Sequence, residues 1–525
     1  MTHFAGASDD TGGTGPDCAQ PARRGFARWP DRLRGLRRDG SSNGTTTLSG
    51  GRAAILFAPL LLAGCSLAPS YVQPPLPTPA AYPDAPPTGP SIARVGWRDF
   101  FRDEQLRALI ADALDNNRDI RMAAARVAQA RAGWRIEGAA LYPDINAVGT
   151  GSRGRSFFNL PGAGPLRPEI KQVTAQLSAG WELDLWGRLR NMRESARNQY
   201  LATEEARRGV ATGIVAQVAI GYLLEREYDE RLALAQQTIA TRQDSLRIMR
   251  RRYEVGSGSK LEMTQAQTLL AQAQNVVEIL VQDRDVNRNA LTLLVGRSVD
   301  LAPGSLDALE TGQDMAVPAG LPSELLVYRP DVIAAEYQLR AVHADIGAAR
   351  AAFLPRIQLT GAFGSTSPDL ESLFGADSRS WNFTPTISLP LFNAGRLAAN
   401  LDLAKARRIE AVAVYEKAVQ TAFRDVSDAL VRRRQLARQI KITRDVYDAL
   451  RERARLAQLR FDNGRSAYLE VLDAQRDLFE TEQALVQLRR AHLASSVALY
   501  AALGGGFVPD VAVPPDSNQQ PGGKK

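Results

Sequence analysis

Hydrophobic and polar residues alternate at every second position in four short parts of the chain, which predicts strands with one apolar and one polar face. The predicted strands are 145–149, 173–185, 357–363 and 381–391. The linking segments 153–170 and 364–380 are rich in Gly, Pro and Ser, so we expect two hairpins with exposed loops. Pro385 lacks the backbone N–H that a strand donates, which weakens the prediction for the middle of the last strand.

A helical spacing follows each hairpin over a long stretch. Residues 188–254 contain no proline and only three glycines, which predicts a rod of roughly 100 Å whose glycines permit a bend near 209–221. A return helix is expected to end near Val295, and the second half repeats this plan at 396–461 and 468–503. The heptad stripe that predicts a coiled-coil seam in the first rod consists of Tyr228, Leu232, Ala235, Ile239, Arg242, Leu246, Met249 and Tyr253.

The chain contains an internal duplication. Residues 119–145 align without a gap with 331–357, and residues 253–267 align with 461–475. The second alignment pairs Gly256 with Gly464 and Glu262 with Glu470. Because solenoid units repeat at a period of about 20–50 residues, this much longer period indicates a duplicated half-protein.

These patterns predict five regions. We expect a leader and signal peptide at 1–64, a lipid anchor and Pro-rich tether at 65–100, a first repeat at 101–300, a second repeat at 301–506 and a disordered tail at 507–525. Helices are expected from about Phe101 to Ala140. The repeats are expected to hold hairpins at 141–185 and 355–391 and coiled coils at 188–295 and 396–503.

Two amphipathic hairpins do not suffice to cross a membrane alone. Transmembrane barrels need about eight strands, and an open sheet edge is not tolerated in lipid. We therefore predict a mainly α-helical fold with a membrane β-barrel portion, in which three chains supply twelve strands. The alternative is a water-soluble sandwich of two sheets, which fits poorly with two long coiled coils.

Composition and motifs argue against an enzyme. The net charge of +8 is scattered along the chain, so we expect no nucleic-acid partner. His3 lies in the predicted leader, and His343 and His492 have no Cys or carboxylate at metal-ligand spacing, so neither a metal site nor a cofactor is predicted. The string Gly40-Ser41-Ser42-Asn43-Gly44 lies in the leader, outside the strand–turn–helix context of a nucleophile elbow.

A short apolar segment precedes the second of the two cysteines. Residues 53–63 follow Arg52 and are too few to span a bilayer, but they have the length of a signal-peptide core. Leu62-Ala63-Gly64-Cys65 resembles the bacterial lipobox, which implies cleavage before Cys65 and acylation of its thiol, and so contact with membrane lipid. The alternative is an ordinary cleaved signal with an incidental cysteine.

Several longer motifs resemble bacterial outer membrane efflux proteins of the TolC/OprM type, in the lipidated NodT-like branch. They include 181–190 (WELDLWGRLR), 328–364, 388–396 (SLPLFNAGR), 468–476 (YLEVLDAQR) and 499–506 (LYAALGGG). The resemblance implies a homotrimer with a twelve-stranded barrel in the outer membrane and a twelve-helix periplasmic tunnel. It also implies a periplasmic adaptor and an inner-membrane transporter, commonly of the resistance-nodulation-division class.

The resemblance places function at the periplasmic ends of the coiled coils. It implies a constricted acidic entrance at Glu470 and Asp473, matched in the first repeat by Glu262 and Gln265, although Gln265 lacks the second carboxylate. The alternative is a solvated helix face near a turn. Adaptor docking is expected at the turns, at Gly256, Ser257, Gly258, Asn463, Gly464 and Arg465, although these residues could equally serve only to reverse the chain.

We therefore expect a passive trimeric exit duct for drugs or other small solutes, anchored by lipid in the outer membrane with a large periplasmic portion. Two alternatives stay open from the sequence alone. One is the duct of a type I protein secretion system, and the other is a lipid-anchored coiled-coil protein without a pore.

Overall fold

The structure is a computed structural model that describes residues 66–79, 81–82, 93, 95–160, 164–310 and 322–506, which belong to one compact unit. The predictions for the leader, for Cys65 and for the tail at 507–525 lie outside the described residues. The helices are α1 (Trp97–Phe100), α2 (Glu104–Asn116), α3 (Arg118–Ala139), α4 (Arg188–Glu254), α5 (Lys260–Val295), α6 (Asp307–Glu310), α7 (Leu325–Tyr328), α8 (Pro330–Ala351), α9 (Arg396–Asp462) and α10 (Tyr468–Ala502), with 3₁₀ turns η2 (Pro322–Glu324) and η3 (Ala376–Ser378).

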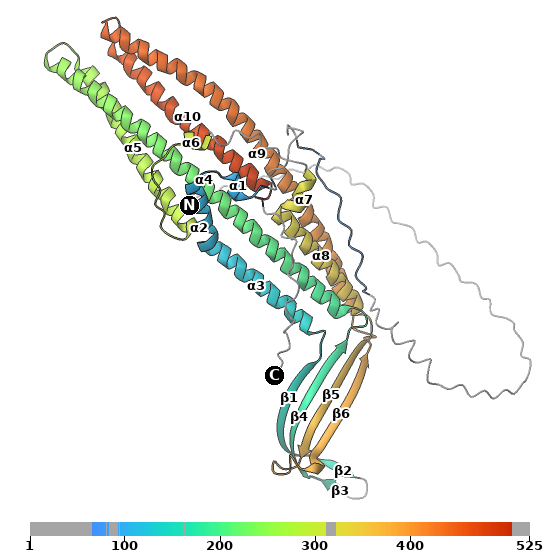
Figure 1. The fold of residues 1–525 in the computed structure, drawn as a ribbon. Coiled ribbons are helices and arrows are strands. Elements are labelled where there is room, and N and C mark those ends of the chain that lie inside the picture. Colours follow the sequence, from blue (N-terminus) through green and yellow to red (C-terminus); the bar gives the residue numbers. More distant parts are fainter. Residues whose placement is uncertain are drawn as a thin grey trace, which may run out of the picture. The chain divides into compact units, whose positions relative to one another are not determined.

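Four long strands form one antiparallel sheet in the order β1-β4-β5-β6 (Figure 1). The strands of this sheet are β1 (Asp144–Arg155), β4 (Glu169–Leu183), β5 (Arg356–Ser367) and β6 (Arg379–Ser388), and a small ladder pairs β2 (Phe158–Leu160) with β3 (Gly164–Leu166). The two predicted hairpins are joined through β4 and β5, where Leu177 lies opposite Phe363. One strand of each hairpin, β1 or β6, is left at an edge of the sheet within this chain.

The bounds of the strands differ from the prediction, and β4 runs over Glu169–Leu183 rather than over 173–185. β1 continues to Arg155 and β5 to Ser367, so the loops predicted at 153–170 and 364–380 are shorter, because ladder hydrogen bonds override the weak strand propensity of Gly and Ser. β6 ends at Ser388 rather than at 391, just before Pro390, whose ring restricts the preceding residue and removes a donor. Pro385 lies in β6 opposite Leu359 of β5, so a strand forms here despite the missing donor.

The long helices match the sequence pattern closely. α4 and α5 form one antiparallel pair and α9 and α10 form the other, and each pair extends away from the sheet (Figure 1). α4 is unbroken through its three glycines. At Gly221 a Cβ atom would lie 2.7 Å from Cδ2 of Leu291, so this glycine permits close packing of α5 on α4. The helical region predicted at 101–140 is two helices, because Asn117 caps α3 by accepting hydrogen bonds from the backbone of Asp119 and Ile120.

The hydrophobic core is concentrated where α2, α4, α8, α9 and α10 meet. Its largest fully buried side chains include Tyr222, Leu291, Leu339, Tyr415 and Tyr500. Along the predicted seam of α4, Leu232, Ala235, Arg242 and Met249 are buried, whereas Tyr253 at the very end is exposed. None of the helices in the described ranges is both long and apolar enough to cross a membrane.

Candidate functional site

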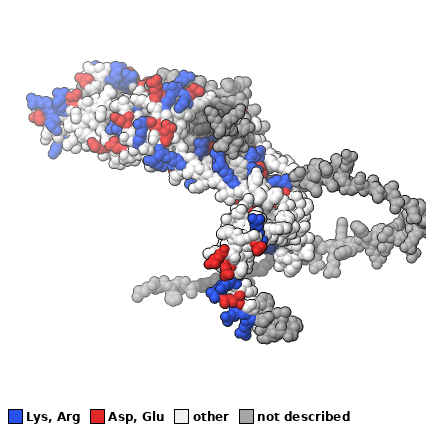
Figure 2. Space-filling model, turned by 60° about the horizontal axis from the view of Figure 1, so that its bottom comes forward, with Lys and Arg blue, Asp and Glu red and all other residues white. Residues whose placement is uncertain are grey.

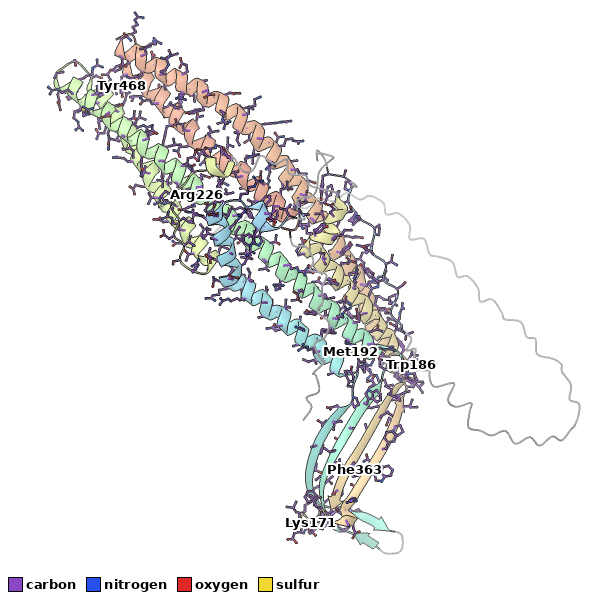
Figure 3. All side chains as sticks on the ribbon, in the orientation of Figure 1. Lys171, Trp186, Met192, Arg226, Phe363 and Tyr468 are labelled. Atoms are coloured by element: carbon purple, nitrogen blue, oxygen red, sulfur yellow. The ribbon has the colours of Figure 1, made fainter. Side chains whose placement is uncertain are left out.

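The apolar face of the sheet is exposed in the chain, which is the reverse of an ordinary soluble protein. On β4, Leu177 is 56% exposed while Thr174, on the polar face of the same strand, is buried, and on β6, Trp381 is 78% exposed. Phe363, between them on β5, is also exposed and is labelled near the middle of the sheet in Figure 3. A contiguous apolar surface of this kind marks a contact with a membrane or with another protein.

Charged residues occur only near the two ends of the four strands. Asp, Glu, Lys and Arg are absent from 145–152, 172–181, 357–367 and 380–388. At about 3.3 Å per residue, residues 172–181 extend roughly 33 Å along β4, and a tilt of about 40° reduces this to a height of roughly 25 Å. That height is the thickness of the apolar band of an outer membrane barrel, which is about 25 Å. The absence of charged residues from these segments is visible in the sequence. The alternation of apolar and polar positions does not by itself give the height of the uncharged band.

Charges cluster at both ends of that uncharged band. At the end near the helices, Arg188 donates to Glu182 at 2.8 Å and Arg190 pairs with Asp184 at 3.2 Å. At the far end, near Lys171 in Figure 3, Arg153 pairs with Glu169. The sheet therefore has two polar rims that suit the two aqueous sides of a membrane.

The described chain begins beside the near rim of the sheet. Oγ of Ser66 donates to Oδ1 of Asn191 at 3.1 Å, and Nη1 of Arg350 donates to the carbonyl of Leu67 at 3.1 Å. Nε1 of Trp186, labelled in Figure 3, donates to the carbonyl of Pro355 at 2.8 Å and ties the start of α4 to the start of β5. The residue that follows Cys65 is thus held at the level where helices pass into strands.

Buried ion pairs fasten the two helical pairs to each other about halfway along α4. Arg490 donates to Glu227 at 2.7 Å and Arg231 donates to Gln483 at 2.7 Å, and both contacts join α4 to α10. Arg489 contacts Glu310 at 2.7 Å. Burial acts to lower the pKa of Arg489, but its hydrogen bond to Glu310 and the neighbouring carboxylates raise that pKa overall. We call Glu227, Arg231, Gln483, Arg489 and Arg490 the central clasp.

The central clasp does not follow from the apolar seam positions of the sequence. The signal was the charged run Glu225–Arg231 in a helix that otherwise shows apolar periodicity. Glu225 is fully buried and accepts hydrogen bonds from Asn287 and Arg288 of α5, the latter at 2.6 Å. Such a run inside a packed helix predicts paired charges, because an unpaired buried carboxylate is costly.

The first tip, where α4 turns into α5, is built around a capping box. The backbone N–H of Glu262 donates to Oγ of Ser259, and the carboxylate of Glu262 accepts from the backbone N–H of Ser259, both at 3.1 Å. Gly256 has a positive φ of 77°, which favours glycine in this turn. Glu262 therefore has a structural role in addition to the predicted gate role, and Gln265 is half-buried on the same helix.

The second tip, where α9 turns into α10, leaves its carboxylates outside a cap. The N-cap residue is Ala467, which has no side-chain hydrogen bond, so Glu470 does not close a capping box. Glu470 instead lies 3.4 Å from Arg460, and Asp473 lies 3.5 Å from Arg476. Both carboxylate side chains are close to half exposed, at 49% and 42%.

The predicted site residues thus fall into two groups. Glu470 and Asp473 share one face of α10, and Glu262 and Gln265 share one face of α5, as the spacing of three predicts. The turn residues Ser257, Gly258, Asn463, Gly464 and Arg465 lie at the two tips. Within the described residues, no cluster of three or more His, Cys, Asp or Glu side chains is placed to hold a metal ion.

Comparison with known proteins connects this architecture to one family. The family model described as outer membrane efflux protein matches residues 109–297 and 321–505, which together exceed half of the chain. The solvent efflux pump outer membrane protein SrpC of Pseudomonas putida is 41% identical over 459 residues, covering 86% of this chain and 97% of that protein. The cation efflux system protein CusC of Escherichia coli K12 is 39% identical over 451 residues, covering 85% and 97%.

Solved structures give the same result. The open state of the MtrE outer membrane channel of Neisseria gonorrhoeae has a TM-score of 0.76 and 34% identity, covering 84% of this chain and 98% of that one. The two segments that match the family model also carry the two copies of the internal duplication. On sequence, length and fold together, the chain belongs to the outer membrane efflux protein family.

Proposed function

We propose that this protein is the outer membrane channel of a tripartite efflux pump, a passive exit duct for drugs or other small solutes. The observation that carries the proposal is the sheet, whose apolar face is exposed over an uncharged band of membrane height and whose strands continue into helical rods. Family membership agrees with an outer membrane location and with transport.

The channel wall requires more than one chain. Among the described residues the sheet has four strands and ends in two edges without a further partner strand, and three copies would close a barrel of 3 × 4 = 12 strands. Three copies of the four long helices would likewise supply a tunnel of 3 × 4 = 12 helices. The homotrimer is supported by the open edges β1 and β6, which lipid does not tolerate.

Acylation at Cys65 would anchor the protein beside its barrel. Ser66 and Leu67 contact Asn191 and Arg350 at the near rim of the sheet, so an acyl chain on the preceding residue would reach the adjacent leaflet. A Cys65→Ser variant that still received a lipid, as judged by the mass of its mature N-terminal peptide, would refute this assignment.

The cargo class is not fixed by similarity. Relatives of nearly equal identity are named for solvent, toluene, antibiotic and cation efflux. A duct that takes its selectivity from an inner-membrane transporter, reached through a periplasmic adaptor, is consistent with this spread. We assign the transporter to the resistance-nodulation-division class, as the family resemblance implies.

Deletion of the gene distinguishes efflux from protein secretion. We expect the deletion strain to become more susceptible to antibiotics, solvents or toxic cations, while its secreted proteome stays unchanged. An unchanged susceptibility profile together with the loss of a secreted protein would assign the duct to type I secretion.

The gate is proposed at the second tip. Three copies of Glu470 and Asp473 would place a ring of carboxylates at the entrance, which attracts cations and holds back anions. Glu262 contributes less because its carboxylate already caps α5, and Gln265 contributes no charge. The turns themselves are proposed as the adaptor-docking sites.

The double variant Glu470→Gln with Asp473→Asn tests the gate. We expect a lower cation preference in planar bilayers, and no such change in the control Glu278→Gln with Asp285→Asn, which removes the same charge from exposed positions of α5. Equal cation preference in the gate variant, the control and the native channel would exclude Glu470 and Asp473 from the gate.

A further inference from the structure

We propose that a cleft between α4 and α10 binds a small organic acid that has an apolar body and a hydroxyl group. The cleft has a volume of about 270 Å³, and all of its walls belong to one chain. The side chains on its walls that carry charges or polar groups chosen for this argument are Thr238, Thr241, Arg242, Gln475 and Glu482. Because binding here requires neither a pore nor a partner chain, the inference goes beyond the proposed function.

Arg242 is the charged member of the otherwise apolar heptad stripe on α4, and it lines the cleft. It is only 4% exposed. Its Nη1 donates to the carbonyl of Leu269 at 2.5 Å, and its guanidinium lies 5.3 Å from the ring centroid of Phe479. Its Nε has no hydrogen-bond partner, and among the described residues no carboxylate forms an ion pair with it. A buried cation in this state is costly, so an anion bound beside it would be stabilised.

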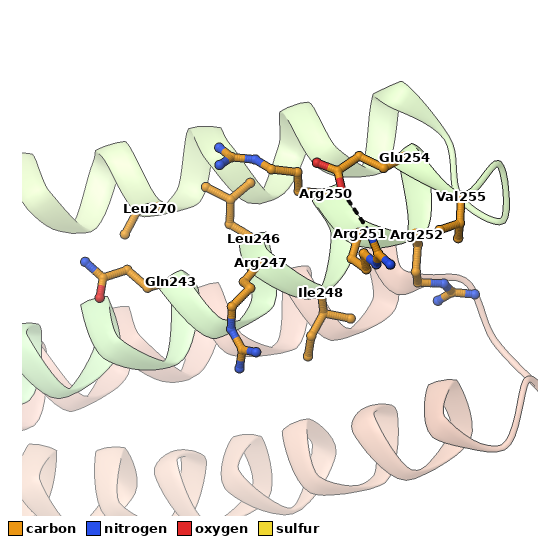
Figure 4. A pocket seen from close by; sticks show the side chains of 10 residues that line it. All are labelled: Gln243, Leu246, Arg247, Ile248, Arg250, Arg251, Arg252, Glu254, Val255 and Leu270. Atoms are coloured by element: carbon orange, nitrogen blue, oxygen red, sulfur yellow. Dashed lines mark ion pairs between the residues drawn. The ribbon is translucent and has the colours of Figure 1, made fainter.

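The arginines nearer to the end of α4 have different surroundings. Arg247 lies 3.0 Å from Asp244, and Arg251 lies 3.6 Å from Glu254 in the ion pair marked in Figure 4. These two arginine side chains are 76% and 77% exposed, and Lys and Arg side chains gather on the surface at this end of the helical part, at the left of Figure 2. Arg242 has neither this exposure nor a carboxylate partner within the described part of the chain.

Other polar atoms of the cleft call for a hydrogen-bond donor. Oε1 of Gln475 is buried and has no partner. Oγ1 of Thr238 donates to the carbonyl of Leu234 at 2.9 Å, and Oγ1 of Thr241 donates to that of Gln237 at 3.2 Å. Both hydroxyl oxygens can still accept a hydrogen bond. A ligand hydroxyl would therefore find acceptors here, and Oε1 of Gln475 would gain most because it is buried.

Two carboxyl groups near the cleft still permit an anion to bind. Glu480 is exposed and raises the pKa of Arg242 without forming an ion pair with it. Glu482 lines the cleft, and burial raises the pKa of its carboxyl group, although the charge of Arg451 lowers that pKa in part. The carboxyl group of Glu482 is therefore protonated more readily than an exposed one, and in that form it donates a hydrogen bond.

The remaining walls of the cleft set the body and the size of the ligand. They are formed by apolar side chains, which include Leu234, Ala454, Leu478 and Phe479. The volume lies just below the range of about 300–1,000 Å³ that is typical of pockets for drug-sized ligands, so it suits a smaller molecule. Ordered water would satisfy the polar atoms but would leave the apolar walls hydrated. A small acid with an apolar body matches both kinds of wall.

The internal duplication shows that the coiled-coil seam does not require a cation at this position. α4 and α9 each contain 67 residues and align over their full length, so Arg242 corresponds to Leu450. Leucine is the residue that a heptad seam favours. Gln475 corresponds to Gln267, so the amide occurs in both repeats and the cation in the first repeat alone. This difference indicates that Arg242 has a role besides packing.

The test uses the mature protein in lipid nanodiscs and compares four small probes of similar size. They are para-hydroxyphenylacetate, phenylacetate, para-hydroxyphenylacetamide and tyramine. We expect para-hydroxyphenylacetate to bind at one site per chain with a Kd of about 0.1–1 mM, measured by calorimetry. The amide should bind about tenfold more weakly because it offers no charge to Arg242. Phenylacetate should bind about fivefold more weakly because it leaves Oε1 of Gln475 unpaired, and the cation tyramine should bind most weakly.

Three variants locate the site. Arg242→Leu installs the residue of the second repeat, and it should weaken the binding of para-hydroxyphenylacetate about tenfold without lowering the Tm of the ligand-free protein. Arg247→Leu is the matched control, which removes an exposed arginine from the same helix and should bind normally. Gln475→Met removes the amide at nearly constant size, and it should abolish the difference in affinity between para-hydroxyphenylacetate and phenylacetate.

Each contrary result overturns the inference. If para-hydroxyphenylacetate shows no saturable binding up to about 10 mM, the cleft holds ordered water only. Equal affinity for the acid and its amide, or equal affinity of Arg242→Leu and the native protein for the acid, would exclude Arg242 as the anion-binding group. Tighter binding of tyramine would assign the cleft to a cation held by Glu482. The acid and the amide are compared on the native protein, so this comparison stands even if a variant does not fold.

Discussion

The sheet and the long helices of this protein follow opposite rules of burial. In the helical part, Leu232, Ala235 and Met249 are turned inward, and the buried charges of the central clasp are paired. In the sheet, Leu177 and Trp381 are turned outward, and charges are restricted to the two rims. One polypeptide is therefore built for two solvents, water around the helices and hydrocarbon around the sheet.

The difference shows that an exposed apolar residue can stabilise or destabilise a protein, depending on whether water or lipid surrounds it. The exposed face of the sheet would promote aggregation in water, but in a bilayer it is the stabilising surface. In the helical part, by contrast, the same residue types stabilise only when they are removed from water. Substitutions of one kind should therefore have different effects in the two regions.

Removal of a carboxylate from the central clasp should have the largest effect. Glu227 is 2% exposed and accepts from both Arg231 and Arg490. Glu227→Ala leaves two guanidinium groups without this partner, and we expect a loss of about 3–5 kcal/mol in the free energy of unfolding. Thermal unfolding in detergent measures the loss, with Asp244→Ala as an exposed control, and a shift no larger than that of the control would contradict the role of the clasp.

A charge on the apolar face of the sheet should come next. Leu177→Arg is expected to destabilise the membrane-inserted form by about 2–4 kcal/mol and to reduce the protein recovered in outer membranes. Ser178→Arg places the same charge one residue along β4, on the opposite face, and should be tolerated because that face is proposed to line the lumen. Equal recovery of the two variants in outer membranes would contradict the assignment of one face of β4 to lipid and the other to the lumen.

Substitutions at the two helix caps of the tips should have smaller effects on stability, and the two effects should have opposite signs. Ser259→Ala removes the capping box of α5 and should cost about 1 kcal/mol. Ala467→Ser installs the missing cap on α10 opposite Glu470 and should stabilise by a similar amount. In this Ala467→Ser variant the Glu470 carboxylate should also accept a hydrogen bond in the cap, which should lower the cation preference of the channel. A variant that is stabilised but has an unchanged cation preference would exclude Glu470 from the gate.

Acid should produce the smallest effect, through His343. Burial lowers the pKa of His343 below its ordinary value of 6.5, and the charge of Arg408 lowers it further. The folded protein therefore binds this proton less readily than the unfolded chain, and stability falls as the pH drops below 6.5 toward the folded pKa. His343→Gln should reduce the fall in Tm between pH 8 and pH 5, and an unchanged difference would contradict a buried neutral imidazole.

Much of the fold could be predicted because its elements are long and periodic. The bounds of α4, α5 and α9 follow from proline-free stretches that end at glycine turns, and β4 follows from strict alternation. The end of β6 and the shortened loops could not be predicted, because they depend on which strand lies beside which. The pairing of β4 with β5, which joins two hairpins separated by a long coiled coil, is likewise a tertiary feature.

The candidate site was predictable in position but not in detail. Duplication and family resemblance led to Glu262 and Glu470 as equivalent residues, yet their environments differ because Ser259 can cap a helix and Ala467 cannot. The central clasp could not be predicted. It depends on the orientation of charged side chains around α4 and α10, which periodicity of apolar residues does not report.

The most direct test of the central claim is a planar-bilayer recording on the purified mature protein whose oligomer mass has been determined in the same mild detergent. We predict a particle of three chains that inserts and gives steady, cation-preferring conductance, and a Leu177→Arg sample that gives far fewer insertions. A monomeric particle that never conducts, although it is folded and carries both helical pairs, would contradict the claim that three sheets close a pore in lipid.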